Sequence, residues 1–168
     1  MFINSLLSHV ISTLMERNKR ALVIGINTYD HFPNLDKCEN DASDIHNFLE
    51  ETGFTSNLLL NPTQSQIIDN VKSFKAGIER SEITLIYYSG HGIQDDKHNF
   101  VVCRDSDVKQ IEDIEYNCYH VDHLLLPNID DNLHILILDA CRNNPFNDGR
   151  KSLQFGLLKM LAPKGTII

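Results

Sequence analysis

The sequence contains no tryptophan and only four cysteines among its 168 residues. No pair of cysteines forms a CxxC motif or stands at a Cys/His spacing typical of zinc ligands, so neither a zinc motif nor a disulfide framework is expected. No apolar run is long enough to cross a bilayer. We therefore expect a cytoplasmic protein with reduced thiols and no membrane association.

Positive charge is also scarce. The chain carries 15 Lys and Arg against 23 Asp and Glu, which gives a formal net charge of −8. Surfaces that bind nucleic acid are normally basic, so no nucleic-acid partner is expected. The phosphate-binding motifs GxGxxG and GxxxxGK[ST] do not occur either, which leaves a nucleotide-binding domain as a poor alternative.

The first 19 residues are predicted to form an amphipathic helix that packs on a single domain at 20–168. Apolar residues recur there at helical spacing: Leu6, Leu7, Val10, Ile11 and Leu14. The segment lacks a basic leader region and a small-residue cleavage site, so a signal peptide or a membrane-surface helix is the weaker alternative.

The rest of the sequence alternates apolar strands with amphipathic helices. Strands are predicted at 20–27, 55–61, 82–92 and 132–141, with a short hairpin arm at 99–105. Helices are predicted at 40–54 and 63–80, and a short one at 121–128. This order favours an α/β fold with a mainly parallel sheet flanked by helices on both faces.

Unusual residues follow three of these strands: "CEND" (38–41), "YSGHG" (88–92) and "DACR" (139–142). In an open parallel sheet, chemistry collects beyond the carboxyl ends of the strands. A thiol is a weak nucleophile until a base makes it a thiolate, and His91 is the natural base for Cys141.

Glycines flank the candidate base. Gly90 and Gly92 are expected to let the backbone turn sharply and to leave the imidazole of His91 exposed. The backbone amides of Gly92 and Cys141 are candidate donors to an oxyanion. Cys103, Cys118 and the remaining histidines are interpreted as structural, because a lone residue of either type is more often packed than catalytic. Cys38 is a candidate to line the cleft, with no catalytic role.

The pattern "YYSGHG", followed 50 residues later (141 − 91) by "DACR", resembles the caspase-like cysteine peptidases of the metacaspase and paracaspase type. The segment "ALVIGINTYDHFPNLDKCENDASDIHNFL" resembles their first strand, loop and helix. The resemblance implies a caspase–haemoglobinase fold and endopeptidase activity. By position, His91 matches the general base, Cys141 the nucleophile, and Gly92 the glycine whose amide helps to form the oxyanion hole.

The S1 pocket departs from that of caspases, in which a Gln stands two residues before the cysteine and a first-loop Arg binds an aspartate at P1. Here that position is Asp139, and no Arg occurs between Gly25 and Asp41. Asp41 and Asp139 match the acidic S1 residues of metacaspases and paracaspases, so cleavage after Arg or Lys is predicted. The alternatives are a helix N-cap for Asp41 and a carboxylate satisfied by loop amides for Asp139.

The resemblance implies protein or peptide substrates with a basic P1 residue, cleaved in regulatory or stress and defence proteolysis. The reaction requires no cofactor and no resident metal, although acids at 94–96 and 103–108 leave a calcium requirement open. The segment 156–168 resembles the lead into the family's next strand. The small-subunit part is therefore expected to be missing, and a small-subunit chain or a homodimer would supply it. The alternative is a non-catalytic caspase-like module that acts by interaction or assembly.

Overall fold

The computed structural model describes residues 17–80, 82–126, 131–141 and 154–168. The predicted N-terminal helix falls mostly on residues 1–16, which lie outside the described residues, as does the side chain of Cys141. Among the described residues, no helix combines the length and apolar character needed to cross a membrane.

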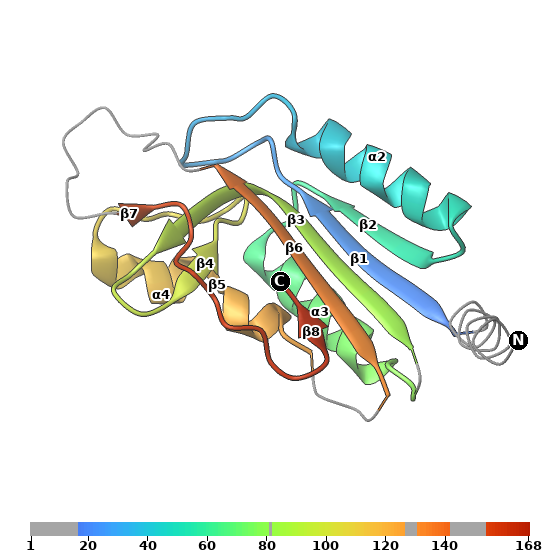
Figure 1. Cartoon of the computed structure of the whole chain (residues 1–168). Coiled ribbons are helices and arrows are strands. Elements are labelled where there is room, and N and C mark those ends of the chain that lie inside the picture. Colours follow the sequence, from blue (N-terminus) through green and yellow to red (C-terminus); the bar gives the residue numbers. More distant parts are fainter. Residues whose placement is uncertain (1–16, 81, 127–130, 142–153) are drawn as a thin grey trace, which may run out of the picture.

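The centre of the fold is a parallel sheet with the order β2-β1-β3-β6-β8. Its strands are β1 (Lys19–Gly25), β2 (Thr55–Leu60), β3 (Ile83–Gln94), β6 (Leu133–Cys141) and β8 (Thr166–Ile167). Figure 1 shows the carboxyl ends of β1, β3 and β6 gathered at one end of the sheet. The predicted strands of the parallel sheet are confirmed.

Two helices cover opposite faces of this sheet, as predicted (Figure 1). One is α2 (Cys38–Glu51), which buries Ala42 and Leu49 against β1 and β3. The other is α3 (Gln64–Ala76), which buries Ile67, Val71 and Phe74. A capping box begins α3, since the side chains of Thr63 and Gln66 and their backbone amides pair reciprocally.

The remaining elements surround the far end of β3. They are β4 (Asn99–Val101), β5 (Tyr119–His120), β7 (Gln154–Phe155), α4 (Ile114–Asn117) and the 3₁₀ turns Ile111–Asp113 and Val121–Leu124. The short helix predicted at 121–128 is therefore a 3₁₀ turn, and 127–130 lie outside the described residues.

The strand β3 is longer than predicted, and the sharp turn expected at its glycines is wrong. The strand continues through Gly90 and Gly92 to Gln94. Antiparallel pairing explains this extension, because β4 pairs with the backbone of residues 92–94 and β7 pairs with 93–94. A single strand thus carries the catalytic candidate His91 through the centre of the fold.

Candidate active site

The two catalytic candidates lie at the same level of neighbouring strands. The Cα atoms of His91 in β3 and Cys141 in β6 are partners in the parallel register. Neighbouring strands lie about 5 Å apart, so the two residues share the carboxyl end of the sheet. The backbone of Cys141 belongs to β6, and the position of its thiol lies outside the described residues.

The imidazole of His91 is buried, with 3% of its surface exposed, so the expectation of an exposed ring is wrong. The ring packs against Tyr29 and Phe32, with ring centroids 4.7 and 6.0 Å away. Both aromatic residues come from the loop after β1, which folds over the end of β3. Burial lowers the pKa of His91, so the ring is predominantly neutral at pH 7, as a general base requires.

Hydrogen bonding determines which ring nitrogen of His91 carries the proton. The atom Nε2 lies 2.8 Å from the carbonyl oxygen of Pro33. A carbonyl oxygen can only accept, so the proton of the neutral ring is on Nε2 and the lone pair is on Nδ1. Within the described part of the chain, Nδ1 is buried and has no hydrogen-bond partner. The arrangement therefore leaves Nδ1 as the basic atom.

Two tyrosines hold the backbone of His91. The backbone N–H of His91 donates to the hydroxyl of Tyr29 over 2.9 Å, and the hydroxyl of Tyr88 donates to the carbonyl of His91 over 2.7 Å. A Cβ atom on Gly90 would lie 2.5 Å from the Tyr88 hydroxyl and 2.7 Å from that of Tyr29. Glycine is therefore required at this position by the close approach of the tyrosines and not by a turn.

Asparagine side chains fix the loop that supplies Tyr29, Phe32 and Pro33. The amide oxygen of Asn61 accepts the backbone N–H groups of Asn27 and Thr28, at 2.9 and 3.0 Å. Asn61 has a positive φ of 48°, a left-handed conformation that asparagine tolerates better than most residues. The amide oxygen of Asn34 accepts from the N–H of Tyr29 over 2.9 Å. These hydrogen bonds hold the loop after β1 in its place against His91.

The oxyanion candidate Gly92 stands beside the end of β6. A Cβ atom on Gly92 would lie 2.8 Å from the Cβ of Ala140, the residue before Cys141. The carbonyl of Gly92 accepts a hydrogen bond from the N–H of Gly156 over 3.0 Å. The peptide edge of Gly92 is thus close to the nucleophile position, and its role as an oxyanion donor stays a prediction.

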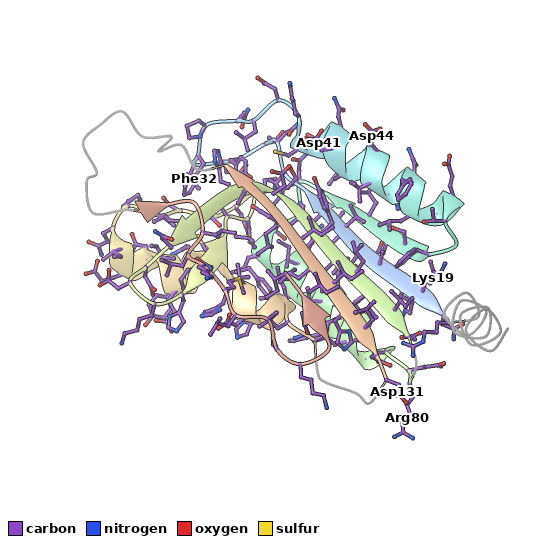
Figure 2. All side chains as sticks on the ribbon, in the orientation of Figure 1. Lys19, Phe32, Asp41, Asp44, Arg80 and Asp131 are labelled. Atoms are coloured by element: carbon purple, nitrogen blue, oxygen red, sulfur yellow. The ribbon has the colours of Figure 1, made fainter. Side chains whose placement is uncertain are left out.

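The two acidic candidates Asp41 and Asp139 lie near the same tyrosine. Burial raises the pKa of Tyr87, and the charges of Asp139 and Asp41 raise it further. Both carboxylates therefore lie within electrostatic range of one phenol, with Asp139 exposed and Asp41 half-buried. Figure 2 shows Asp41 at the end of α2 that lies nearest the loop of Phe32.

The N-cap alternative for Asp41 is wrong. The helix α2 begins at Cys38 with Lys37 as its N-cap, and Asp41 lies within the first turn. The first turn packs directly on β1, because a Cβ atom on Gly25 would lie 2.5 Å from the carbonyl oxygen of Cys38.

Cys103 and Cys118 are packed, as interpreted from the sequence. Both are buried, and so is Cys38. Burial raises the pKa of Cys118 to about 12 and that of Cys103 still higher, which keeps both thiols protonated and unreactive.

Two of the acids proposed as calcium ligands, Asp95 and Asp105, accept hydrogen bonds from the chain itself. Asp95 accepts the backbone N–H groups of Lys97 and His98, at 2.7 and 2.6 Å. Asp105 accepts the N–H of Gln64 at the start of α3 over 2.8 Å. No group of three metal-ligating side chains in the described ranges is arranged to hold a metal ion. A calcium requirement stays a prediction without a site.

Residues 18–160 match the family described as Caspase domain. Human mucosa-associated lymphoid tissue lymphoma translocation protein 1 is 27% identical over 137 residues, which cover 80% of this chain and 16% of the relative. Metacaspase-1A of Neurospora crassa is 29% identical over 129 residues, covering 69% of this chain and 27% of the relative. The chain thus spans a minor part of these curated relatives.

Two solved structures share the fold. A protein of Geobacter sulfurreducens superposes with a TM-score of 0.60 at 23% identity, covering 74% of this chain and 50% of that one. The Drosophila initiator caspase Dronc superposes with a TM-score of 0.56 at 17% identity, covering 88% and 52%. The chain therefore spans about half the length of both structures.

Proposed function

Because the chain belongs to the caspase domain family, we propose that it is a cysteine endopeptidase domain in which Cys141 is the nucleophile and His91 the general base. One observation carries the proposal. The strand register pairs His91 with Cys141, and hydrogen bonding to Pro33 leaves the lone pair of the buried imidazole on Nδ1.

The mechanism follows from the chemistry of a thiol beside a neutral imidazole. His91 Nδ1 takes the proton of the Cys141 thiol, and the thiolate attacks the scissile carbonyl carbon. The N–H groups of Gly92 and Cys141 stabilise the negative oxygen of the tetrahedral intermediate. The protonated His91 then gives its proton to the leaving amine. Water, deprotonated by His91, hydrolyses the thioester and releases the second product.

The carboxylates Asp41 and Asp139 are proposed to select a basic P1 side chain. Both affect the same phenol of Tyr87, which supports a shared anionic position on the α2 face beside β6. A guanidinium can bind carboxylates through paired hydrogen bonds, and an ammonium binds them as a point charge. An aspartate at P1 would be repelled.

The proposed partner is a chain that extends the sheet beyond β8. This two-residue strand pairs with β6, and Ile167 is 55% exposed. An exposed strand edge is a template for further pairing. We propose that a small-subunit chain or a second copy of this chain pairs there. Light scattering after size-exclusion chromatography tests the second copy, and a strictly monomeric chain would exclude it.

The direct test compares fluorogenic peptides that end in Arg, Lys or Asp before the reporter. Turnover of the basic peptides by the wild type and its loss in Cys141→Ala are expected. Equal turnover by the two proteins would reject the peptidase proposal, and a preference for the Asp peptide would reject only the S1 assignment.

A second assay separates a peptidase from a non-catalytic module without requiring turnover. An Arg-containing peptidyl acyloxymethyl ketone alkylates an activated thiol in a peptidase site. Mass spectrometry should locate the label on Cys141, and His91→Ala should abolish it. Absence of labelling at Cys141 in the wild type would favour the interaction module.

A further inference from the structure

A cavity lies away from the candidate catalytic residues, between α3 and the strands β4 and β5. It has a volume of about 540 Å³, within the range typical of small-molecule sites. Neither His91 nor the carboxylates Asp41 and Asp139 line it. The peptidase chemistry therefore makes no use of this cavity.

The walls of the cavity combine an apolar body with cationic groups. Ile68 of α3 is half-buried and supplies accessible apolar surface, whereas the lining residues Val71, Phe100 and Tyr119 are almost fully buried. Lys72 and Lys75, from the same face of α3, supply two ammonium groups. Such a lining fits a molecule that has both an apolar part and a negative charge.

The charge of this cavity is opposite to that of the whole molecule. The protein has a formal net charge of −8, yet two lysines and only one carboxylate, that of Glu115, line the cavity. Burial lowers the pKa of Lys75, and no described carboxylate offsets that shift. A bound anion would supply the missing partner.

A histidine at the cavity wall adds a hydrogen-bond donor. The ring centroids of His120 and His123 lie 5.3 Å apart at the cavity wall. The backbone N–H of Asp122 donates to Nδ1 of His120 over 3.1 Å, so the proton of the neutral His120 ring is on Nε2. The Nε2–H group of His120 is a donor suited to a carboxylate oxygen.

The same hydrogen bond argues against a metal ion at His120. A neutral imidazole binds a metal through a lone pair, and the lone pair on Nδ1 already accepts the N–H of Asp122. The described residues hold no group of three ligands arranged for a metal. The cavity is thus suited to an organic anion.

We propose that this cavity is a binding site for a small organic carboxylate with an apolar or aromatic body. The single negative charge matches the excess of one positive charge that two lysines and Glu115 leave. A dianionic phosphate would meet the repulsion of Glu115 without a third cation. The apolar body lies against Ile68 while the carboxylate faces Lys75.

The test uses 4-phenylbutyrate as the probe and 4-phenylbutan-1-ol as its uncharged match. Amide and methyl NMR shifts on the wild-type chain should locate the acid at this cavity, with a Kd of about 1 mM for a ligand of this size. The alcohol should bind at least about tenfold more weakly, because it lacks the charge-assisted bonds. Equal binding of the two, no binding of the acid up to about 10 mM, or shifts confined to other surfaces would overturn the proposal.

Variants then identify the cation. Lys75→Gln should weaken phenylbutyrate binding about tenfold, whereas Lys75→Arg should keep it within about threefold, since only the former removes the charge. Lys164→Gln, at an exposed lysine that does not line the cavity, is the matched control and should leave binding unchanged. Unaltered binding in Lys75→Gln, or tighter binding of phenyl phosphate than of phenylbutyrate, would contradict the assignment. Circular dichroism confirms that each variant is folded.

Discussion

The two ends of the parallel sheet use their polar side chains in opposite ways. At the amino ends of the strands, Lys19 donates to the carbonyl of Thr52 after α2, and Arg20 donates to the carbonyl of Gly77 after α3. The side chain of Asn132 bridges Glu82 and Glu79 through two hydrogen bonds of 3.0 and 2.8 Å. These groups complete backbone hydrogen bonding and stabilise helix ends.

At the carboxyl ends, a buried imidazole and an exposed carboxylate have polar atoms that can meet a substrate. Among the described residues, Nδ1 of His91 is buried without a hydrogen bond, and the carboxylate of Asp139 is exposed. Figure 2 shows Phe32 and Asp41 toward this end and Lys19, Arg80 and Asp131 toward the other. An unpartnered buried group costs stability. In the described part of the chain Nε of Arg17, at the amino end, is also buried without a partner, but a guanidinium stays protonated, so of these two atoms only Nδ1 of His91 can act as a base.

The largest expected effect comes from removing the base at the carboxyl end. His91→Ala should lower kcat/KM for an Arg peptide by about 10³- to 10⁴-fold, because the thiol then lacks its proton acceptor. Fluorogenic assays measure the loss, and Cys118→Ala, at a buried cysteine remote from the proposed chemistry, is the control. Undiminished activity in His91→Ala would remove the functional distinction between the two ends.

The pH profile tests the same imidazole without a mutation. Burial lowers the pKa of His91 below its ordinary 6.5, and only the neutral ring accepts the thiol proton. Activity should therefore persist at pH 6.5 and fall as the pH decreases through the lowered pKa, about tenfold per pH unit. Initial rates of kcat/KM across pH 4.5–8 measure it; half-maximal activity clearly above pH 6.5 would contradict the assignment.

A smaller effect is expected from the acidic pair. Asp139→Asn should lower kcat/KM for Arg peptides by roughly 10- to 100-fold, because the guanidinium loses a charged acceptor. Asp41→Asn should act in the same direction. The control is Asp44→Asn, at an exposed acid of the same helix (Figure 2), which should leave the kinetics unchanged. If Asp44→Asn and Asp139→Asn lowered activity equally, the effect would belong to net charge and not to an S1 pocket.

The next prediction compares two glycines by the free energy of unfolding. Gly90→Ala should destabilise the protein by about 2 kcal/mol, because the new methyl group collides with two tyrosine hydroxyls. A methyl group on Gly53 would meet no described atom within 4 Å beyond its chain neighbours, and φ there is +86°. Gly53→Ala should therefore cost only about 1 kcal/mol, through backbone strain. Urea denaturation measures the free energy of unfolding of both variants.

The peptidase activity of the same two variants tests whether Gly90 positions His91. Equal losses of activity in Gly90→Ala and Gly53→Ala would mean that it does not.

The smallest effect is expected from a substitution at the amino ends of the strands. Lys19→Ala should lower the unfolding free energy by about 0.5 kcal/mol, since it removes a half-buried cation from the end of α2. Thermal unfolding measures the change, and kcat/KM should stay at the wild-type value. A kinetic effect as large as that of Asp139→Asn would show that the two ends are not functionally separate.

Much of the fold could be predicted because its signals are local. Each signal spans only a few neighbouring residues, as in the apolar runs of β1, β2, β3 and β6 and in the capping box at Thr63. The pairing of His91 with Cys141 was also predictable, since both follow parallel strands. The boundaries of β3 were not, because its last residues are extended by pairing with β4 and β7, which are remote in the sequence.

The environment of the candidate base required the tertiary structure. Tyr29, Phe32 and Pro33 stand in "NTYDHFPN", which has the composition of an ordinary polar loop. Nothing local to that loop indicates that it covers His91, more than 50 residues away. The contacts of His120 with His123 were missed for the same reason, since each histidine alone is typical of a structural residue.

The sequence by itself determined the chemical identities at this site: a cysteine and a histidine at the ends of neighbouring strands, and two aspartates near them. The types, the order and the spacing of these residues are properties of the sequence itself. The tertiary structure alone decided the state of those groups, because burial and hydrogen bonding arise from distant segments. The loop after β1 buries the imidazole, lowers its pKa and, through the carbonyl of Pro33, leaves Nδ1 as the basic atom.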